Sequence, residues 1–341
     1  MKQIPLSFVG SDTYLTLGAG NFNIAMQGAD MSIGAGPGND TVQMNGVKNS
    51  AVTLGAGNST VVETNSSNNI ILLQSVKGNT DTVDAGASPR GAILVGGGNT
   101  AITDNGKGAY IAVGDGNNTI TAAGQGDVIT ARAGANTIIA RGDSDLINVA
   151  VLGGKSDTII ANGYSDTIVS AGSNTAINAA GGHDRIAVNG GSAVVTASGW
   201  ADVISVGGNT DGTPAKANVS ITTLSKVYVA GHTLGTVISE SGVDNAVFLE
   251  NGGSAAVTLG VGGNTVTVGA NTDGSSGYSG LAKIIDLGTN TVDLHNLAGL
   301  GTYAQVSAAL VHAGGWKLST PGGGEVVFMG EKPTAANFAF T

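Results

Sequence analysis

The chain of 341 residues has no cysteine, only six prolines, 4% aromatic residues and 11% charged residues. Without cysteine it forms neither disulfides nor thiolate metal sites. No apolar run approaches the length of a membrane span, so membrane insertion is not expected. Proline is absent between Pro89 and Pro214, so no proline interrupts regular structure there. These absences exclude a disulfide-stapled domain and a helical membrane protein.

Glycine is the residue in excess, with 57 copies, or about 17% where about 7% is usual. Glycine adopts positive φ angles at little cost, and asparagine and aspartate tolerate them better than other residues do. The composition therefore predicts a chain with many tight corners.

A nine-residue repeat runs through the middle of the chain. Each copy has a small residue, then Asn or Asp, usually Thr or Val, then Ile, Val or Leu. The anchor residues are Asn118, Asp127, Asn136, Asp145, Asp157, Asp166, Asn174, Asp184, Ala193 and Asp202, with successive spacings of 9, 9, 9, 12, 9, 8, 10, 9 and 9. A tandem unit of this length predicts a solenoid, with a short β-branched strand and a turn in each unit.

Glycine-rich phrases in the N-terminal third, at residues 17–21, 54–58, 95–99 and 113–117, recur at about twice that period. Two units then make one coil of roughly 18–20 residues. We therefore predict an all-β fold, a right-handed parallel β-solenoid of the β-roll type, over residues 1–295. Residues 208–216 and 269–277 are expected to form loops that leave a coil edge.

The repeat fades after Asp293, and residues 296–341 are predicted to form a C-terminal cap. Tyr303, Val306 and Leu310 have helical spacing within residues 302–312, and glycines follow. Residues 316–318 and 326–328 are expected to pair as a hairpin. Such a cap would cover the open end of a solenoid.

The repeats resemble the calcium-binding nonapeptides of RTX proteins, which run Gly-Gly-x-Gly-x-Asp-x-apolar-x and fold as a β-roll. The most complete copy is Gly36-Pro37-Gly38-Asn39-Asp40-Thr41-Val42, and most other copies are degenerate. The resemblance implies calcium ions between adjacent corners, held by Asp carboxylates and Gly carbonyl oxygens. The implied metal-binding residues are Gly36, Gly38, Asp40, Asp127, Asp145, Asp157, Asp166, Asp184 and Asp202.

Departures from the family pattern leave two interpretations of these anchors open. If two corners make one coil, one edge keeps Asp127 and Asp145, whereas the other presents Asn118 and Asn136. The first edge is then predicted to bind calcium, and the second to stack an asparagine ladder. Alternatively, all these Asp and Asn residues are turn formers that satisfy backbone N–H groups at the corners.

The sequence also carries features of export. Residues 1–8 lack the apolar run of a cleaved signal peptide. Residues 326–330 and 335–340 resemble the uncleaved C-terminal signals of RTX proteins that leave the cell by type I secretion. We therefore expect an extracellular or cell-surface location.

No constellation of catalytic residues is apparent, and the chain is predicted not to be an enzyme. The four histidines lie in different units, and the arginines and lysines are scattered. A phosphate-binding loop, a nucleophile elbow and a zinc-spaced cluster are all missing. The net charge of −10 argues against a nucleic-acid partner.

The remaining functions are structural or adhesive. We expect a secreted protein of the bacterial cell surface or biofilm matrix, which associates with itself through its solenoid ends into filaments or layers in a calcium-dependent way. One alternative is ice binding by threonines that follow the anchors, at Thr119, Thr137, Thr158, Thr167 and Thr175. Another is binding of surface polysaccharide by Tyr110, Tyr164 and Trp200.

Overall fold

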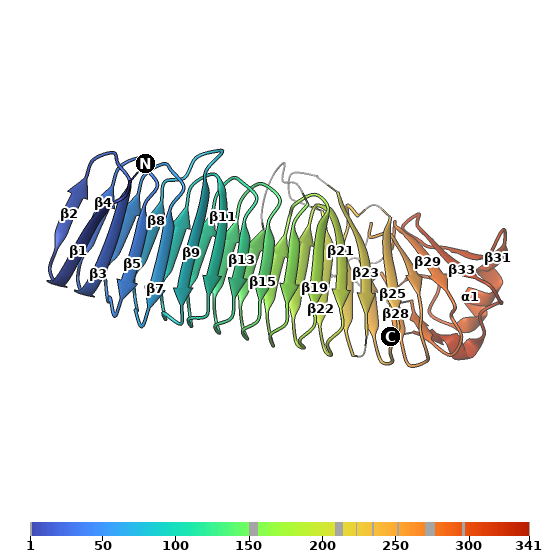
Figure 1. Cartoon of the computed structure of the whole chain (residues 1–341). Helices are drawn as coiled ribbons and strands as arrows, with labels where there is room; N and C mark the ends of the chain where they lie inside the picture. The colour runs from blue at the N-terminus through green and yellow to red at the C-terminus, as the bar shows by residue number, and fades with distance from the viewer. Residues whose placement is uncertain are drawn as a thin grey trace. The chain divides into compact units, whose positions relative to one another are not determined.

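The computed structural model describes residues 2–149, 156–208, 214–222, 224–233, 235–250, 252–269, 277–294 and 297–340. The chain forms two compact units, residues 1–167 and 168–341. Both are parallel β-solenoids in which successive strands alternate between two sheets (Figure 1). The all-β solenoid prediction is therefore confirmed. The expected boundary after residue 295 falls within the second unit, and most of both expected loops lies outside the described residues.

In unit 1 the odd-numbered strands form sheet A and the even-numbered strands form sheet B. Sheet A contains β1 (Ile4–Ser11), β3 (Phe22–Ala29), β5 (Thr41–Asn45), β7 (Thr60–Thr64), β9 (Thr80–Gly86), β11 (Asn99–Asp104), β13 (Thr119–Ala122), β15 (Thr137–Ala140) and β17 (Thr158–Ala161). Sheet B contains β2 (Tyr14–Leu17), β4 (Ser32–Ala35), β6 (Ala51–Leu54), β8 (Ile70–Leu73), β10 (Ala92–Val95), β12 (Tyr110–Val113), β14 (Val128–Ala131) and β16 (Leu146–Val149). The next strand, β18 (Thr167–Ser170), begins at the last residue of this unit.

Unit 2 continues the same alternation. Its sheet A strands are β19 (Thr175–Ala179), β21 (Gly191–Ala197), β23 (Ala215–Ile221), β25 (Thr236–Glu240), β27 (Ala255–Thr258) and β29 (Leu281–Ile285). Its sheet B strands are β20 (Arg185–Asn189), β22 (Val203–Gly207), β24 (Lys226–Val229), β26 (Ala246–Leu249), β28 (Thr265–Val268) and β30 (Thr291–Asp293).

The strand register gives the coil length and places the core. Ile120 pairs with Ile138, 18 residues further on, and Ile138 pairs with Ile159. All three side chains have 0% exposure, because alternate residues of each strand point between the two sheets. The core is therefore a column of aliphatic side chains, in which each coil repeats the inward-facing residues of the last.

Corner glycines are required mainly because neighbouring corners lie in contact. A Cβ on Gly124 would lie 1.5 Å from the carbonyl oxygen of Gly106, and a Cβ on Gly142 would lie 1.4 Å from that of Gly124. Neither glycine has a positive φ angle. The expectation that positive φ angles explain the corner glycines is therefore incomplete. Many of them are needed because stacked backbones leave no room for a side chain.

Positive φ angles occur at a second position, directly before the buried aspartate that ends each of these turns into sheet B. Gly126, Ser144 and Ser165 occupy this position in successive coils of unit 1, with φ angles of 71°, 62° and 61°. Side-chain-bearing residues thus adopt a left-handed conformation that favours glycine.

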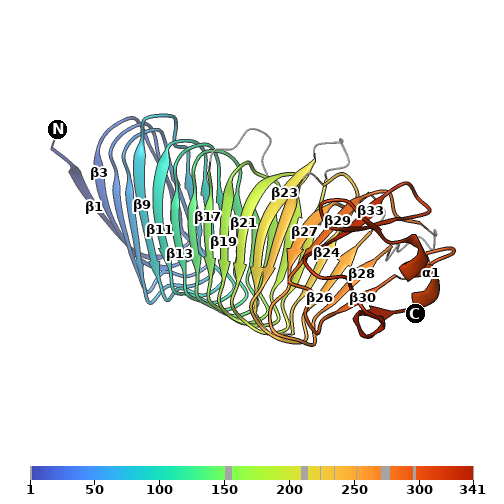
Figure 2. The same cartoon turned by 90° about the vertical axis from the view of Figure 1, so that its right-hand side faces the viewer.

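The end of unit 2 is covered, as expected for a cap (Figure 2). Helix α1 (Tyr303–Ala309) is followed by β31 (Val311–His312), and β32 (Trp316–Ser319) pairs antiparallel with β33 (Glu325–Met329). Strand β33 also pairs in parallel with β29, and β34 (Phe338–Ala339) follows the 3-10 turn η1 (Ala335–Asn337) and pairs with β30. The predicted helix and hairpin are both confirmed, and the C-terminal segment adds β31, β32 and β33 to sheet A and β34 to sheet B.

We predict opposite effects for glycine exchanges at the left-handed corner position. Ser144→Gly should stabilise the folded chain by about 0.5–1 kcal/mol, because relief of the left-handed conformation exceeds the added freedom of the unfolded chain. Gly126→Ala, at the same position one coil earlier, should destabilise by about 1 kcal/mol. Chemical denaturation followed by circular dichroism measures both.

Gly124→Ala tests the stacking of corners instead of the φ angle. Gly124 has no positive φ angle, but its alanine Cβ would clash with the backbone of the neighbouring coil. This substitution should cost about 1–3 kcal/mol. A Gly124→Ala protein as stable as the wild type would show that the corners are not stacked as described.

Candidate functional site

The anchors end two kinds of turn. We call the turns that lead into sheet A strands corner A, and those that lead into sheet B strands corner B. Among the expected metal ligands, corner A holds Gly36, Gly38, Asp40 and Asp157, and corner B holds Asp127, Asp145 and Asp166 in unit 1 and Asp184 and Asp202 in unit 2. The predicted separation of Asp127 and Asp145 from Asn118 and Asn136 is confirmed. The nine proposed ligands do not converge on one corner.

Corner B of unit 1 holds a column of buried carboxylates. The backbone N–H of Ala109 donates to Asp127 Oδ1 at 2.8 Å, that of Asp127 to Asp145 Oδ1 at 2.8 Å, and that of Asp145 to Asp166 Oδ1 at 2.9 Å. These three Asp side chains are at most 1% exposed. Each carboxylate therefore satisfies a corner N–H of the preceding coil.

The second carboxylate oxygen has no such role. Asp127 Oδ2 and Asp145 Oδ2 are buried and have no hydrogen-bond partner among the described residues, and the same holds for Asp202 Oδ2 at corner B of unit 2. A buried carboxylate oxygen without a donor is costly unless the group is protonated or an ion neutralises it.

Burial raises the pKa of these carboxyl groups. It raises the pKa of Asp145 to about 7, against a lowering hydrogen bond from the Asp127 N–H, and the carboxylates of Asp127 and Asp166 raise it further. The pKa of Asp166 is raised to about 6, again mainly by burial. Asp145 and Asp166 therefore take up protons, or another positive charge, in the range around neutral pH.

Corner A has amides where corner B has acids. Asn118 Nδ2 donates to Asn136 Oδ1 at 2.9 Å, and Asn136 Nδ2 donates to Asp157 Oδ1 at 3.0 Å. The backbone N–H groups of Asn118 and Asn136 donate to the same two oxygens, at 3.3 and 2.8 Å. The asparagine ladder expected at this edge is present, and it ends on the carboxylate of Asp157.

The most complete RTX-like copy also lies at corner A, away from the acid column. Asp40 Oδ1 accepts from the Phe22 N–H at 2.9 Å, and Asp40 Oδ2 has no partner among the described residues. The next coil brings Ser59 to this position, as the pairing of Thr41 with Thr60 requires. A Cβ on Gly38 would lie 1.6 Å from the Gly20 oxygen, so this glycine stacks on its neighbour.

The structure places one anchor one residue later than the sequence predicts. Thr175 rather than Asn174 pairs with Ala193 and is buried, whereas Asn174 is exposed with a φ angle of 59°. With Thr175 as the anchor, the irregular sequence spacings of 8 and 10 both become 9. The repeat is thus more regular than the Asn and Asp residues alone indicate, because a threonine replaces them in this coil.

Corner A also holds a second, exposed asparagine column that the sequence did not predict. The N–H of Asn39 donates to Asn21 Oδ1 at 2.8 Å, and that of Asn58 to Asn39 Oδ1 at 2.9 Å. The N–H of Asn117 donates in the same way to Asn99 Oδ1 at 2.9 Å. The signal was the asparagine that ends each glycine-rich phrase, one residue before the buried anchor.

The sequence also did not predict the buried acids that end two sheet A strands, Asp104 in β11 and Glu240 in β25. Asp104 pairs with Ala122 of the next coil and is 0% exposed, and burial raises its pKa to about 7. Burial raises the pKa of Glu240 in unit 2 to about 8. Neither residue belongs to the nine-residue pattern, so no spacing marked them.

The described residues contain no group of three or more His, Asp or Glu side chains that could hold a metal ion. Calcium requires six to eight oxygen ligands, many of which can be backbone carbonyls. The unpartnered oxygens of Asp127 and Asp145 fit a hard cation as donors, and the corner backbone would have to supply most of the others. Corner B of unit 1 is therefore the part of the nine-residue set that fits calcium best.

Comparison with protein-family models, with curated proteins and with solved structures gives no match to this chain. None of the described helices is long and apolar enough to cross a membrane.

We predict that the protein loses stability as the pH rises in calcium-free buffer. A carboxyl group whose folded pKa lies above its unfolded value of about 3.9 holds its proton more tightly in the folded chain. Its contribution is complete below about pH 4 and is lost as the pH passes the folded value, about 7 for Asp145. Urea denaturation across this range should give a falling free energy of unfolding.

Asp145→Asn should flatten this dependence and raise stability near pH 8, because asparagine keeps the Oδ1 acceptor for the Asp127 N–H. Exposed Asp115→Asn is the control and should leave the slope unchanged. A wild-type protein that is equally stable at both ends of the range would contradict the burial of the acid column.

Proposed function

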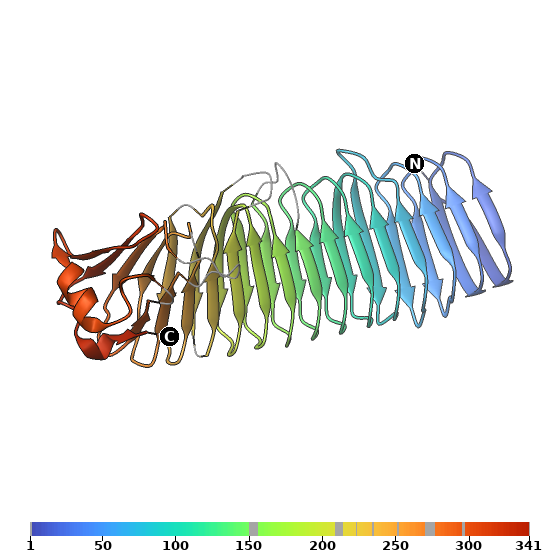
Figure 3. The same ribbon diagram turned by 180° about the vertical axis from the view of Figure 1, so that it is seen from behind.

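We propose that the protein is an extracellular structural protein of the cell surface or matrix, which associates with itself through the N-terminal coil of unit 1. The observation that carries the proposal is the uncovered outer side of β1 and β2 (Figure 3). Among the described residues, β1 pairs only with β3, and β2 only with β4. Unpaired strand edges attract further strands.

The first coil also exposes its apolar interior. Ile4, Leu6 and Phe8 pair with Phe22, Ile24 and Met26, which are buried in the next coil. Ile4 is nevertheless 51% exposed, because no coil of the described residues packs on its outer side. A second copy that paired along β1 would bury this surface and satisfy the free backbone groups.

The covered end of unit 2 limits the kinds of assembly that the chain can form. Because α1 and the β32–β33 hairpin occupy that end, the proposed contact joins two N-terminal coils in a symmetric pair. Such an isologous contact closes on itself. The filaments or layers expected from the sequence would need a further contact surface.

Calcium is part of the proposal as a neutralising ion at corner B of unit 1, where Asp127 and Asp145 would hold it. When bound, the ion would supply the positive charge that the unpartnered carboxylate oxygens lack. The support is the burial of those oxygens together with the resemblance to RTX repeats. The denaturation series repeated with calcium chloride should then show higher stability near pH 8 in the wild type and a smaller gain in Asp145→Asn.

Export by a type I system is proposed from the resemblance of the tail. Its two motifs form β33 and β34, and Val326, Phe328 and Phe338 are buried there. In the folded chain these residues therefore also close the core of unit 2.

Ice binding is a second candidate, because the register aligns more threonines than the sequence indicated. Thr41, Thr60 and Thr82 pair in turn on the outer face of sheet A, and Thr119, Thr137 and Thr158 continue the column after Ala101. Two threonines of the expected array do not join it. Thr167 begins β18, which belongs to sheet B, and the side chain of Thr175 is buried.

We predict that the protein is a dimer at micromolar to millimolar concentration and that Ile4→Lys makes it a monomer. A lysine that points into the coil end would be buried without a partner in the pair. Sedimentation velocity, in calcium and in chelator, measures the oligomeric state.

Leu146→Lys is the matched control, because Leu146 is 40% exposed on the face of sheet B and away from the coil end. It should dimerise like the wild type. A wild-type chain that stays monomeric in both buffers would refute the proposed contact.

For the second candidate, the wild-type protein should shape growing ice crystals and slow their recrystallisation, and Thr119→Lys with Thr137→Lys should abolish both effects. Thr130→Lys on sheet B should retain them. Ice that grows as in plain buffer would exclude this function.

A further inference from the structure

A groove of about 570 Å³ lies on the outer face of sheet B in unit 1, across β8, β10, β12 and β14. Its floor is a register column of Leu72, Leu94, Ala112 and Thr130. Ala112 is smaller than Leu72 and Leu94, and Gly96 and Gly114 line the side of the groove toward corner A. The groove exists because small residues lie between larger ones on consecutive coils.

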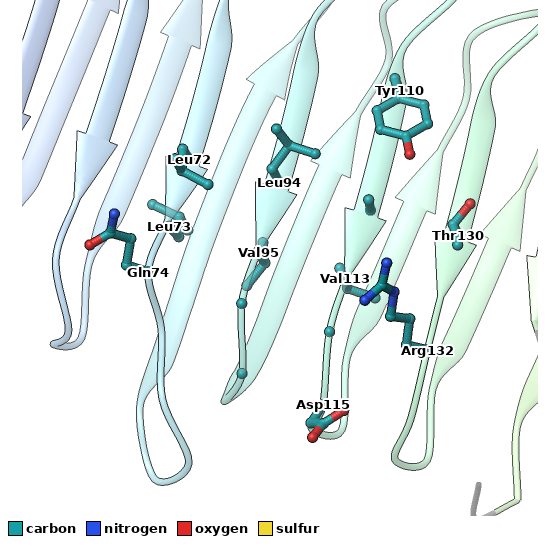
Figure 4. A pocket seen from close by; sticks show the side chains of 14 residues that line it. Leu72, Leu73, Gln74, Leu94, Val95, Tyr110, Val113, Asp115, Thr130 and Arg132 are labelled. Atoms are coloured by element: carbon teal, nitrogen blue, oxygen red, sulfur yellow. The ribbon is translucent and has the colours of Figure 1, made fainter. Parts of the chain in front are cut away.

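The two sides of the groove differ in chemistry (Figure 4). Tyr110 lies at the start of β12 and is 44% exposed. Gln74, Asp115 and Arg132 lie on the opposite side, near the ends of the strands. A ligand in the groove would therefore meet an aromatic ring on one side and polar groups on the other.

The polar groups are available to a ligand. Gln74, Asp115 and Arg132 are exposed, and none of their side chains makes a hydrogen bond or an ion pair within the described part of the chain. A guanidinium and a carboxylate can each bind a pair of adjacent hydroxyl groups, and the Gln74 amide can both donate and accept.

We propose that this groove binds a neutral oligosaccharide. Sugar rings have apolar C–H faces that pack on an aromatic ring and on leucine side chains, and hydroxyl edges that suit the polar side. A mostly apolar lining with a few placed polar groups is typical of binding sites. Four strands at a spacing of about 4.8 Å span roughly 14 Å, enough for a short stretch of a polymer.

Charge decides between neutral and charged polymers. Asp115 and Arg132 bring one charge of each sign to the groove, and the chain as a whole carries −10. A polyanion would be repelled by the chain, and a polycation would meet Arg132. The groove also lies on a sheet face whose backbone groups are bonded within the sheet, so it offers no edge to a peptide strand.

The test is affinity electrophoresis in native gels that contain laminarin, hydroxyethyl cellulose or galactomannan as neutral probes, or alginate as an acidic probe. At least one neutral polymer should retard the wild-type protein. Tyr110→Ala and Arg132→Ala should each weaken that retardation at least tenfold in apparent affinity. Isothermal titration with the matching hexasaccharide checks the constants.

Two controls separate the groove from general surface effects and from misfolding. Arg141→Ala removes an arginine at an exposed position outside the groove and should bind like the wild type. Ala112→Lys, which fills the floor, should abolish binding while the circular dichroism spectrum is unchanged.

The inference is independent of self-association, because the groove lies on a sheet face and the proposed contact lies at β1 and β2. No retardation by any neutral polymer would overturn it. Retardation by alginate alone, or retardation that the Tyr110 and Arg132 variants leave unchanged, would overturn it as well.

Discussion

The structure depends on the hydrogen bonding of parallel strands, which holds successive coils about 4.8 Å apart. Every position of a coil must then be compatible with the same position one coil away. In the interior this gives columns of isoleucine and alanine, such as Ile120 above Ile138. At the corners it brings backbone against backbone, so that Gly124 and Gly142 have no room for a side chain. The close spacing of the coils is thus one cause of the high glycine content.

The same spacing explains why Asn and Asp end the corners. Each turn leaves a buried N–H group that the sheets do not pair, and a short side-chain carbonyl from the next coil reaches it. Asn136 and Asp145 both fill this role as acceptors. They differ in charge, since the acid leaves a buried oxygen and a raised pKa. The turn-forming and metal-binding interpretations of these aspartates are therefore compatible. One carboxylate oxygen accepts the corner N–H, and the other has no hydrogen-bond partner among the described residues.

Much of the fold could be predicted from the sequence because its period is short and its strands repeat in place. The separation of Asp127 from Asn118 followed directly from two units in each coil. The anchor at Thr175 could not be placed, since threonine replaces the amide and a neighbouring asparagine offered a better match. The threonine column and the groove on sheet B arise only when residues 18 to 22 positions apart are brought into register. Variable turn lengths hide that register in the sequence.

Because the two corners differ, insertion or deletion of a half-coil has a different effect from insertion or deletion of a whole coil. A gain or loss of 18 residues returns every side chain to its own sheet and every anchor residue to its own corner. A gain or loss of nine residues would exchange the sheets beyond it, so that acids would enter the asparagine ladder and amides the acid column. The length of such a chain is therefore expected to vary among related proteins by whole coils, although its smallest visible repeat is half of one.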